Sequence, residues 1–393
     1  MSARSGCCRV GIIGTGFAAE SHADALRRLP GVELAGIASR TPARAAEAAE
    51  RLGVARAYAS PGELIEDRDI DAVHICTINR LHSELSAEAL RAGKHVISEK
   101  PLATDSQSTE MLAGLADEAA QSGQLAVVCF NYRHYALIQK LRAMLATGEY
   151  GDMHFVHGSY LQDWLLYDTD WNWRLDPDDN GASRAVADIG SHWLDLVQYV
   201  TGQRVSEVFA DLAMHHRIRQ RPRVEGKTFD NERPMDPAPV QVSSEDFGTV
   251  IIRFASGARG TLVVSQVSPG RKNRLTFQVD TAEAAFSWDQ EQPNTAWIGR
   301  RRSPSLEYPR EPAPGAPSAQ LPAGHPEGWR DSIRNLFEDV YAGVRSLGNG
   351  DAPVGSFATF ADGHRTMMLI DAIMESHRTR AWVRVLDREA APA

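Results

Sequence analysis

Short apolar runs alternate with longer helical stretches along the first third of the chain. The apolar runs predict buried strands at Val10–Gly14, Val32–Ala38, Ala72–Thr77, His95–Ser98 and Leu125–Phe130. The intervening stretches have helical periodicity and predict helices at Ala18–Leu29, Pro42–Leu52, Leu81–Ala92 and Ser106–Gln121. This alternation predicts a doubly wound parallel sheet with helices on both faces.

The pattern changes after about residue 133, where longer strands with period-two alternation become common. We expect strands at Met153–Trp164, Glu207–His215, Phe247–Phe254, Arg259–Val267, Arg274–Val279 and Ala284–Trp288. Helices are fewer and are expected at Ala136–Thr147, Asp188–Val200, Gly328–Leu347 and Phe357–Thr379. These elements predict an open, mostly antiparallel sheet with helices on one face. The polar stretch 217–241 and the proline-rich stretch 300–326 are expected to be surface loops.

The length of 393 residues suits two domains better than a single core. We place the boundary after residue 132, which gives an α/β protein with domains 1–132 and 133–393. The C-terminal helix is expected to pack back on the first domain.

The amino-acid composition argues against a nucleic acid or a membrane as a partner. The 42 Lys and Arg residues against 51 Asp and Glu residues give a formal net charge of −9, so we expect no nucleic-acid partner. No run approaches the ~18 consecutive apolar residues of a membrane span, and the first residues lack the apolar centre of a signal peptide. Four cysteines without a C-x-x-C pair are too few for a disulfide framework. We therefore expect a cytoplasmic protein without a membrane partner.

A glycine-rich loop follows the first predicted strand. Gly14, Gly16 and Ala19 fit the pattern G-x-G-x-x-[G/A], in which the first glycine allows a tight turn and the second lets the backbone approach a pyrophosphate. The loop opens a helix, whose N-terminus favours an anion. This context predicts a Rossmann dinucleotide-binding domain rather than a plain strand–helix turn. The residues expected to contact the cofactor here are Gly14, Thr15, Gly16, Phe17 and Ala18.

The end of the second predicted strand bears on the choice of dinucleotide. NAD sites usually place Asp or Glu here for the ribose 2′-hydroxyl, whereas this chain has Ser39 and Arg40. These side chains can hold a 2′-phosphate, so the cofactor is expected to be NAD or NADP, with NADP favoured. In the alternative interpretation Arg40 stacks on the adenine and NAD binds.

A charged turn, Glu99-Lys100-Pro101, follows the strand at His95–Ser98. Strand C-termini form the ligand crevice of a doubly wound sheet, so Lys100 is expected beside the nicotinamide. A partly desolvated lysine there suits proton exchange with a substrate hydroxyl. The alternative is a surface lysine paired with Glu99.

Asp188, His192 and Asp195 lie at i, i+4 and i+7 of a predicted helix and so share one face. A carboxylate and an imidazole one turn apart can bind a hydroxyl and move its proton. The alternative is a capping Asp188 with a satisfied His192. We expect no metal, because no matching ligand cluster is formed by His22, His74, His82 and His95.

Taken together, the glycine loop, Glu99-Lys100-Pro101 and the segment from Asp188 to Asp195 resemble the Gfo/Idh/MocA family of oxidoreductases. The resemblance implies a Rossmann domain followed by an α/β domain with a large open sheet. It assigns catalytic roles to Lys100, Asp188 and His192, and places Glu99 at the nicotinamide. A homodimer or homotetramer through the C-terminal sheet is expected from the same resemblance.

Further motifs extend this resemblance. Thr77, Ile78, Asn79 and His82 align with the family's Thr-Pro-Asn-x-x-His cofactor loop, with Ile78 replacing the usual proline. After the last Rossmann strand, Asn131 is expected at the cofactor and Tyr132 at the substrate.

The segment Tyr160–Trp164, followed by Trp173-Arg174, resembles the substrate strand of the levoglucosan dehydrogenase branch. The resemblance implies that Gln162 and Asp163 bind sugar hydroxyls, that Trp164 and Trp173 stack on C–H faces, and that Arg174 meets a carboxamide or an acidic group. Trp173 and Arg174 are also expected to reach the cofactor. The alternative is a core strand edge with ordinary aromatic residues.

These features predict an NAD(P)-dependent dehydrogenase acting on a secondary hydroxyl of a sugar or polyol, with C3 of a pyranose favoured. One alternative is a redox-neutral, NAD-dependent glycoside hydrolase of the sulfoquinovosidase type, in which Arg174 and Arg184 bind a sulfonate. A second alternative is a non-catalytic regulator that senses the cofactor.

Overall fold

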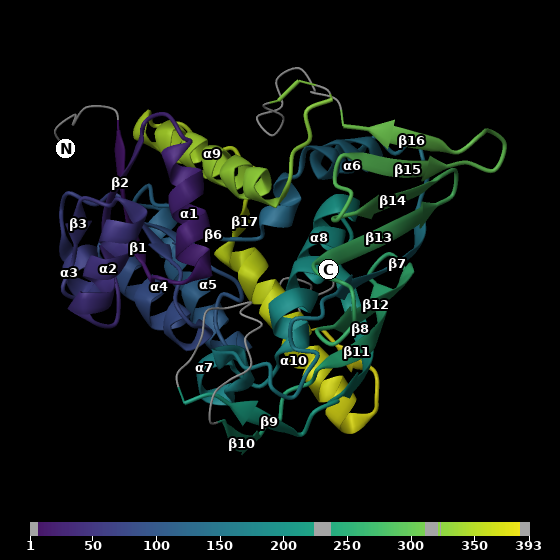
Figure 1. The fold of residues 1–393 in the computed structure, drawn as a ribbon. Coiled ribbons are helices and arrows are strands. Elements are labelled where there is room, and N and C mark those ends of the chain that lie inside the picture. The colour runs from purple at the N-terminus through teal and green to yellow at the C-terminus, as the bar shows by residue number, and fades with distance from the viewer. Residues whose placement is uncertain (1–6, 224–236, 311–320, 323, 386–393) are drawn as a thin grey trace. The chain divides into compact units, whose positions relative to one another are not determined.

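The computed structural model describes residues 7–223, 237–310, 321–322 and 324–385 (Figure 1). Chain contacts divide them into two units. The first unit comprises the described residues up to His134 together with Trp329–His364, and the second comprises Tyr135–Gly328 and the described residues from Arg365. The expected boundary after residue 132 lies close to the first break. The returning helix is α9 (Trp329–Gly348), the penultimate one, whereas most of the last helix, α10 (Phe360–Thr379), belongs to the second unit.

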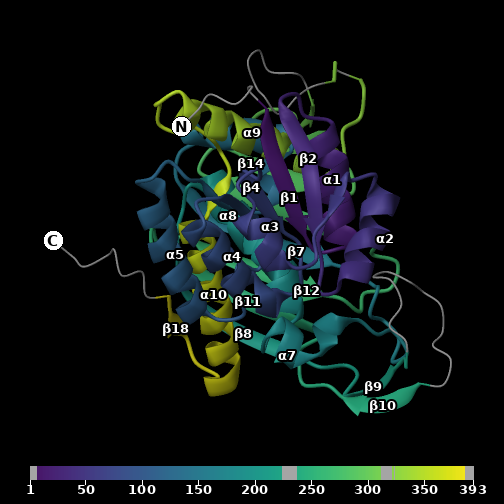
Figure 2. The ribbon, with the colours of Figure 1, turned by 90° about the vertical axis from the view of Figure 1, so that its left-hand side faces the viewer.

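The first unit is built on a seven-stranded sheet of order β17-β6-β5-β4-β1-β2-β3. Strands β1 to β6 are parallel, and β17 joins β6 in the antiparallel sense. Strands β1 and β2 lie side by side in Figure 2. The strands are β1 (Cys8–Ile13), β2 (Val32–Ala38), β3 (Arg56–Ala57), β4 (Ala72–Ile75), β5 (His95–Ser98), β6 (Ala126–Val128) and β17 (Ala358–Thr359).

Helices cover both faces of this sheet. Successive residues of one strand enter different core clusters, as Val127 and Val128 of β6 do, because successive side chains of a strand point to opposite faces. One cluster includes residues of α1 (Phe17–Arg27), α2 (Pro42–Leu52) and α9. The other includes residues of α3 (Pro61–Glu66), α4 (His82–Arg91) and α5 (Ser106–Ala120). The doubly wound parallel sheet is thereby confirmed.

The second unit contains a nine-stranded sheet of order β16-β15-β14-β13-β7-β12-β11-β8-β18. Only the pairing of β7 with β12 is parallel among the described strands of this sheet, so the expected mostly antiparallel sheet is confirmed. The strands are β7 (Met153–Leu161), β8 (Val205–Ala213), β11 (Phe247–Phe254), β12 (Arg259–Ser265), β13 (Arg274–Thr281), β14 (Ala285–Asp289), β15 (Thr295–Gly299), β16 (Leu306–Pro309) and β18 (Val383–Arg384). The helices of this unit include α6 (Ala136–Ala146), α7 (Pro177–Asn180) and α8 (Ser191–Thr201).

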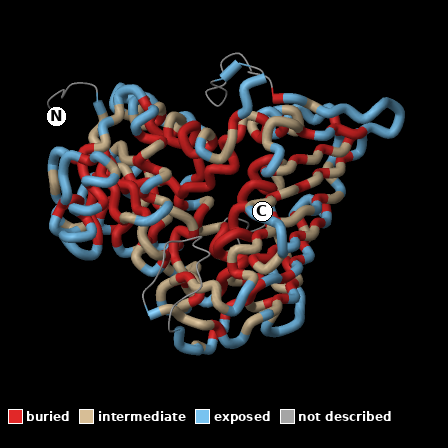
Figure 3. Tube along the Cα trace, in the orientation of Figure 1, coloured by how far each residue is buried: buried red, intermediate tan, exposed pale blue. Residues whose placement is uncertain are grey.

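Residues along the strands of the second unit alternate between buried and exposed (Figure 3). Helix α8 packs on the buried face, at β7 and β13. The strand register places Trp297, Ser287 and Gln278 in one row on the opposite face, which continues through His157 and Thr261 to Ile251. Trp297 is 41% exposed and Ile251 is 39% exposed.

Two stretches expected to be loops contain strands in their described parts, so that expectation is wrong there. Strand β9 (Ile218–Arg221) pairs with β10 (Ala238–Gln241), and β16 extends the large sheet beyond β15. These strands are too short and polar for their own periodicity to reveal them, and the backbone partners hold them. Residues 224–236, 311–320 and 323 of these stretches lie outside the described residues. In the described part of the chain, no helix combines the length and apolar character that a membrane crossing requires.

Candidate active site

The glycine loop joins β1 to α1 in the first unit. Gly14 has φ +121°, and a Cβ there would lie 2.2 Å from the carbonyl oxygen of Cys76, so only glycine fits. Its N–H donates to the carbonyl of Ala38 at 2.9 Å. A Cβ on Gly16 would meet no atom within 4 Å, and Gly16 is the N-cap of α1. No described side chain or backbone therefore crowds Gly16 at the N-terminus of α1, which fits the close approach of a pyrophosphate.

Two side chains brace this loop. The guanidinium of Arg51, at the end of α2, donates to the carbonyl of Thr15 at 3.0 Å and pairs with Glu20. Phe17 is 45% exposed and stacks on Trp329 of α9, with ring centroids 5.4 Å apart. The sequence did not reveal these roles of Arg51 and Trp329. Both residues are distant in sequence from the glycine loop, and their neighbouring residues give no sign of a contact with it.

At the end of β2, Ser39 is buried and Arg40 is exposed. Thr41 follows as the N-cap of α2, its hydroxyl accepting from the Arg44 N–H. No acidic residue occupies the position after β2, and Arg40 and Arg44 are both exposed there.

The Thr77 loop is held by His82, which is only 1% exposed. Its Nδ1 lies 2.7 Å from the carbonyl oxygen of Pro101, and its Nε2 lies 3.1 Å from that of Thr77. His82 thus connects two loops at the carboxyl ends of β4 and β5. Thr77 and Ile78 are half-buried, whereas Asn79 is buried.

The short segment after β6 is buried as well. The Asn131 amide donates to the hydroxyl of Ser332 on α9 at 2.8 Å, and Tyr132 is 2% exposed. Asn131 therefore connects the end of β6 to helix α9 of the first unit.

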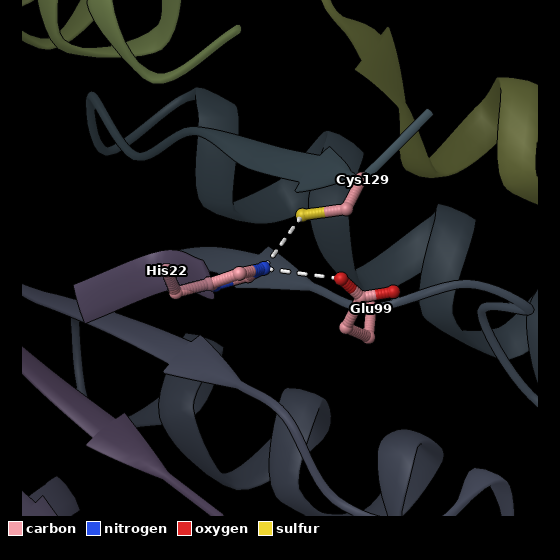
Figure 4. A group of neighbouring side chains, drawn as sticks. All are labelled: His22, Glu99 and Cys129. Carbon is pink, nitrogen blue, oxygen red and sulfur yellow. Dashed lines mark hydrogen bonds and ion pairs between the residues drawn. The ribbon is translucent and has the colours of Figure 1, made fainter. Parts of the chain in front are cut away.

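Glu99 and Lys100 come directly after β5. The Glu99 carboxylate lies 3.0 Å from Nε2 of His22 on α1 (Figure 4). Its other oxygen accepts from the Lys100 backbone N–H at 3.1 Å. Burial alone would raise the pKa of Glu99, but the hydrogen bond from His22, the charge of Lys100 and the backbone hydrogen bond of Lys100 outweigh it and lower the pKa to about 2. Lys100 is half-buried beside this fixed anion.

In the second unit, Asp188 and His192 lie where two helical geometries meet. Val186–Gly190 forms a π-helical turn, and α8 begins at Ser191. Asp188 and His192 are each 8% exposed. The Asp188 carboxylate accepts from Nε of Arg174 at 3.2 Å and from Nε2 of Gln266 at 2.8 Å. Each oxygen of the carboxylate therefore has a donor, which fixes its orientation, and a capping role does not require this.

The position of α8 depends on a glycine. Trp193, next to His192, is fully buried and donates from its indole N–H to the carbonyl of Thr276 at 2.8 Å. A Cβ on Gly158 of β7 would lie 2.6 Å from that indole nitrogen and 2.0 Å from the same carbonyl oxygen. Gly158 thus lets the helix that carries His192 approach the sheet closely.

Behind Asp188 lies a buried charge cluster, which we call the arginine cluster: Arg184, Arg219, Asp246 and Gln266. Asp246 pairs with Arg184 and with Arg219, the latter at 2.7 Å, and all three side chains have 0% exposure. Arg184 donates to Gln266 at 2.8 Å, and Gln266 in turn donates to Asp188. The alternative in which Arg184 binds a substrate sulfonate is therefore wrong. The Arg184 guanidinium is fully buried in the second unit and is bonded to Asp246 and Gln266.

The segment Tyr160–Trp164, which was expected to contact the substrate, lies at the end of β7. The Gln162 amide donates to Asn273 at 2.8 Å and accepts from the Trp164 indole at 2.8 Å. Asp163 accepts from the Gly270 N–H and from Lys272. Arg174 lies over the Trp173 ring, 4.5 Å from its centroid. Gln162 and Asp163, which were predicted to bind sugar hydroxyls, thus both form hydrogen bonds with other residues of the protein.

The structure thus brings Asp188 together with Arg174, and Glu99 with Lys100. Lys100 belongs to the first unit, whereas Asp188 and His192 belong to the second. Gln266, which sequence reasoning missed, is the residue that joins Asp188 to the arginine cluster.

Known proteins share this architecture along most of the chain. Levoglucosan dehydrogenase of Pseudarthrobacter phenanthrenivorans is 29% identical over 402 aligned positions, which cover 96% of this chain and 97% of that protein. Myo-inositol 2-dehydrogenase of Thermotoga maritima is 29% identical over 256 positions, covering 65% and 67%. The solved structure of levoglucosan dehydrogenase in complex with NADH and levoglucosan aligns with a TM-score of 0.85 at 27% identity, covering 96% of this chain and 99% of that one.

The family match covers both units. The description "Oxidoreductase family, NAD-binding Rossmann fold" matches residues 8–130, and "GFO/IDH/MocA C-terminal domain" matches residues 138–287. Together these matches span more than half of the chain, which therefore belongs to the Gfo/Idh/MocA family of NAD-binding oxidoreductases.

Proposed function

We propose that the protein is an NAD(P)-dependent dehydrogenase that oxidises a secondary hydroxyl of a sugar or polyol, with C3 of a pyranose as the favoured position. The names of the relatives support a carbohydrate substrate, since they include levoglucosan dehydrogenase, myo-inositol 2-dehydrogenase and glucose-6-phosphate 3-dehydrogenase. The observation that carries the proposal is the fixed Asp188 carboxylate one turn before His192.

In this proposal the nicotinamide supplies the two-electron chemistry when bound, and the chain supplies binding and proton transfer. Lys100 and His192 exchange the proton of the reacting hydroxyl. Asp188 accepts a hydrogen bond from the substrate and sets its orientation, since Arg174 and Gln266 prevent the carboxylate from turning. Glu99 keeps a negative charge beside Lys100.

For the cofactor we propose NADP ahead of NAD. Arg40 is exposed after β2, and no acidic side chain there would repel a 2′-phosphate. We expect Arg40→Ala to lower kcat/KM for NADP by about tenfold, the equivalent of one hydrogen bond to a charged group, while leaving that for NAD within about twofold. An equal loss with both dinucleotides would contradict the assignment.

The test is a substrate screen with the purified chain. Hexoses, anhydrosugars, inositols and aryl glycosides are each incubated with NAD and with NADP, while nicotinamide reduction is followed by absorbance and products by mass spectrometry. Lys100→Met and His192→Asn should each lower kcat by at least about a hundredfold, as expected for a lost general acid or base. Lys140→Met, at an exposed lysine of α6, is the matched control and should leave kcat unchanged.

The same screen separates the alternatives. Steady nicotinamide reduction supports the dehydrogenase, whereas aglycone release without net reduction would replace it with a redox-neutral glycoside hydrolase. A Lys100→Met variant with full activity, or cofactor binding without turnover of any substrate, would refute the proposal.

We also propose a homo-oligomer through the outer face of the nine-stranded sheet. The exposed apolar side chains of the sheet support it: Val263 on β12 at 41% exposure, Ile251 on the neighbouring β11 at 39%, and Trp297 on β15 at 41%. Light scattering should give a dimer or tetramer, and Ile251→Lys together with Val263→Lys should shift it to monomers. A wild-type monomer would contradict the proposal.

A further inference from the structure

A chain of four polar side chains runs through the core of the first unit and ends at Glu99. His22 Nε2 lies 3.0 Å from the Glu99 carboxylate, His22 Nδ1 lies 2.8 Å from His74 Nδ1, and His74 Nε2 lies 2.7 Å from the Tyr341 hydroxyl. The residues come from α1, β4, α9 and the turn after β5. His22, His74 and Tyr341 are each at most 1% exposed. Buried polar groups of this kind need a specific arrangement of donors and acceptors.

The carboxylate charge decides that arrangement. An ionised Glu99 accepts, so His22 Nε2 carries the proton of that bond. Nδ1 of a neutral His22 is then an acceptor and receives the N–H of His74 Nδ1. His74 Nε2 is consequently an acceptor for the Tyr341 O–H. Every donor in the chain therefore points towards Glu99.

The opposite arrangement is unfavourable. It would place a bare Nε2 of His22 against a carboxylate oxygen at 3.0 Å, so that two acceptors face each other in a buried site. A doubly protonated His22 would reverse the two bonds to His74 and Tyr341 and put a positive charge into the core. Burial lowers the pKa of His74 well below its usual value, so His74 has no charge to contribute.

Packing fixes the two rings in this geometry. Phe337 of α9 packs against both imidazoles in an edge-on arrangement, with each centroid distance 4.7 Å. Cys129 Sγ lies 3.7 Å from His22 Nε2 (Figure 4). Cys76 Sγ lies 3.2 Å from His22 Nδ1. Burial raises the pKa of both thiols well above the usual value, so they remain neutral.

The ligand atoms of His22, Glu99 and Cys129 lie within 4.8 Å of one another, which is also the spacing of a metal site. Their distances are accounted for by hydrogen bonding, because the His22–Glu99 separation is that of a direct N–H···O bond. The thiol of Cys76 faces the other ring nitrogen and could not share an ion with this group. We therefore favour the hydrogen-bonded chain.

We propose that His22, His74 and Tyr341 are positioning residues, which present one fixed N–H to Glu99 and through it hold Lys100 for proton transfer. This rests on the proposed role of Lys100. The backbone N–H of Lys100 donates to the second oxygen of Glu99, so a carboxylate fixed at one oxygen also orients the residue that follows it.

The first test reads the protons directly and needs no activity. Long-range ¹⁵N–¹H spectra of the ¹⁵N-histidine-labelled wild type distinguish protonated from bare ring nitrogens, and His22→Gln and His74→Gln assign the two rings among the 13 histidines. We expect the proton of His22 on Nε2 and that of His74 on Nδ1. The opposite tautomers, or loss of the His22 Nε2 proton with uptake of one equivalent of added zinc, would overturn the proposal.

The second test compares two substitutions of one side chain. His22→Gln retains an N–H donor for Glu99 and should keep kcat within about threefold, whereas His22→Leu should lower it by about tenfold, the equivalent of one hydrogen bond to a charged group. Without the donor, burial raises the Glu99 pKa, so the acid limb of the kcat–pH profile should move to higher pH in His22→Leu.

The matched control is His95→Gln on β5, whose ring accepts from the Leu125 N–H and does not touch Glu99. The His95→Gln substitution should not shift the acid limb of the kcat–pH profile, even if it lowers the stability of the protein. An equal loss of kcat at every pH in His22→Leu would overturn the positioning role. Full activity of Lys100→Met would instead refute the proposed function, while the tautomers of His22 and His74 would stand.

Discussion

Replacing Asp246 by asparagine tests whether the arginine cluster stabilises the second unit. The carboxylate accepts from Arg184 and Arg219 through one oxygen, and from the backbone N–H groups of His215 and His216 through the other, at 2.6 and 3.0 Å. Burial alone would raise the pKa of Asp246, but the two guanidinium groups outweigh it, so the side chain is ionised in the folded protein. Asparagine would remove the charge and turn an N–H₂ group towards donors.

The loss of stability expected for Asp246→Asn follows from the burial of Arg184 and Arg219. Both guanidinium groups have 0% exposure, so neither can recover its lost counter-charge from water. Breaking one side of a buried ion pair costs about 3–5 kcal/mol. At roughly 2–4 °C per kcal/mol for a unit of this size, Asp246→Asn should lower the melting temperature of the second unit by about 10 °C.

Scanning calorimetry at neutral pH measures this shift, and Asp211→Asn is the matched control. Asp211 lies on β8 with a side chain that is 93% exposed, so its substitution should change the melting temperature by less than about 2 °C. An Asp246→Asn protein that melts as the wild type does would show that the cluster carries no net stabilisation. Because Arg184 also holds Gln266 against Asp188, we expect kcat to fall in the same variant.

Three further predictions follow from individual contacts. Gly14→Ala should abolish dinucleotide binding measured by calorimetry, because the added Cβ would lie 2.2 Å from the Cys76 carbonyl oxygen; retained affinity would contradict the turn geometry. Gln266→Leu should lower kcat by about tenfold, because it removes a hydrogen bond to the Asp188 carboxylate, and should also lower the melting temperature, because it leaves a buried N–H of Arg184 without its acceptor; unchanged steady-state kinetics would show that Asp188 is held without it. Since the folded pKa of Glu99 is about 2 and the ordinary value is 4.5, its ionisation stabilises the protein above about pH 4.5, and this is lost as the pH falls towards 2. The free energy of unfolding of the wild type should therefore fall by about 3 kcal/mol more than that of Glu99→Gln over this interval, and parallel pH curves would contradict this.

Local sequence determined much of the first unit. The bounds of β2, α2 and β5 match those expected, because a buried strand and a capped amphipathic helix are each defined by neighbouring residues. The glycine loop was recognisable for the same reason, since the turn, the close approach and the helix start all involve residues within one short segment. The alternation of elements then predicted both sheets.

Tertiary structure decided the contacts that join distant residues. Sequence spacing showed no cluster among the histidines, yet the fold brings His22 and His74 together, with Tyr341 from a returning helix. Strands β9, β10 and β16 exist because they find backbone partners, not because of their own periodicity. Likewise Arg184 is marked by charge in the sequence as a surface or ligand residue, and only its burial with Asp246 and Gln266 shows that it is structural. Periodicity reports the environment along one element, whereas a buried polar group is satisfied by whichever partner the fold places beside it.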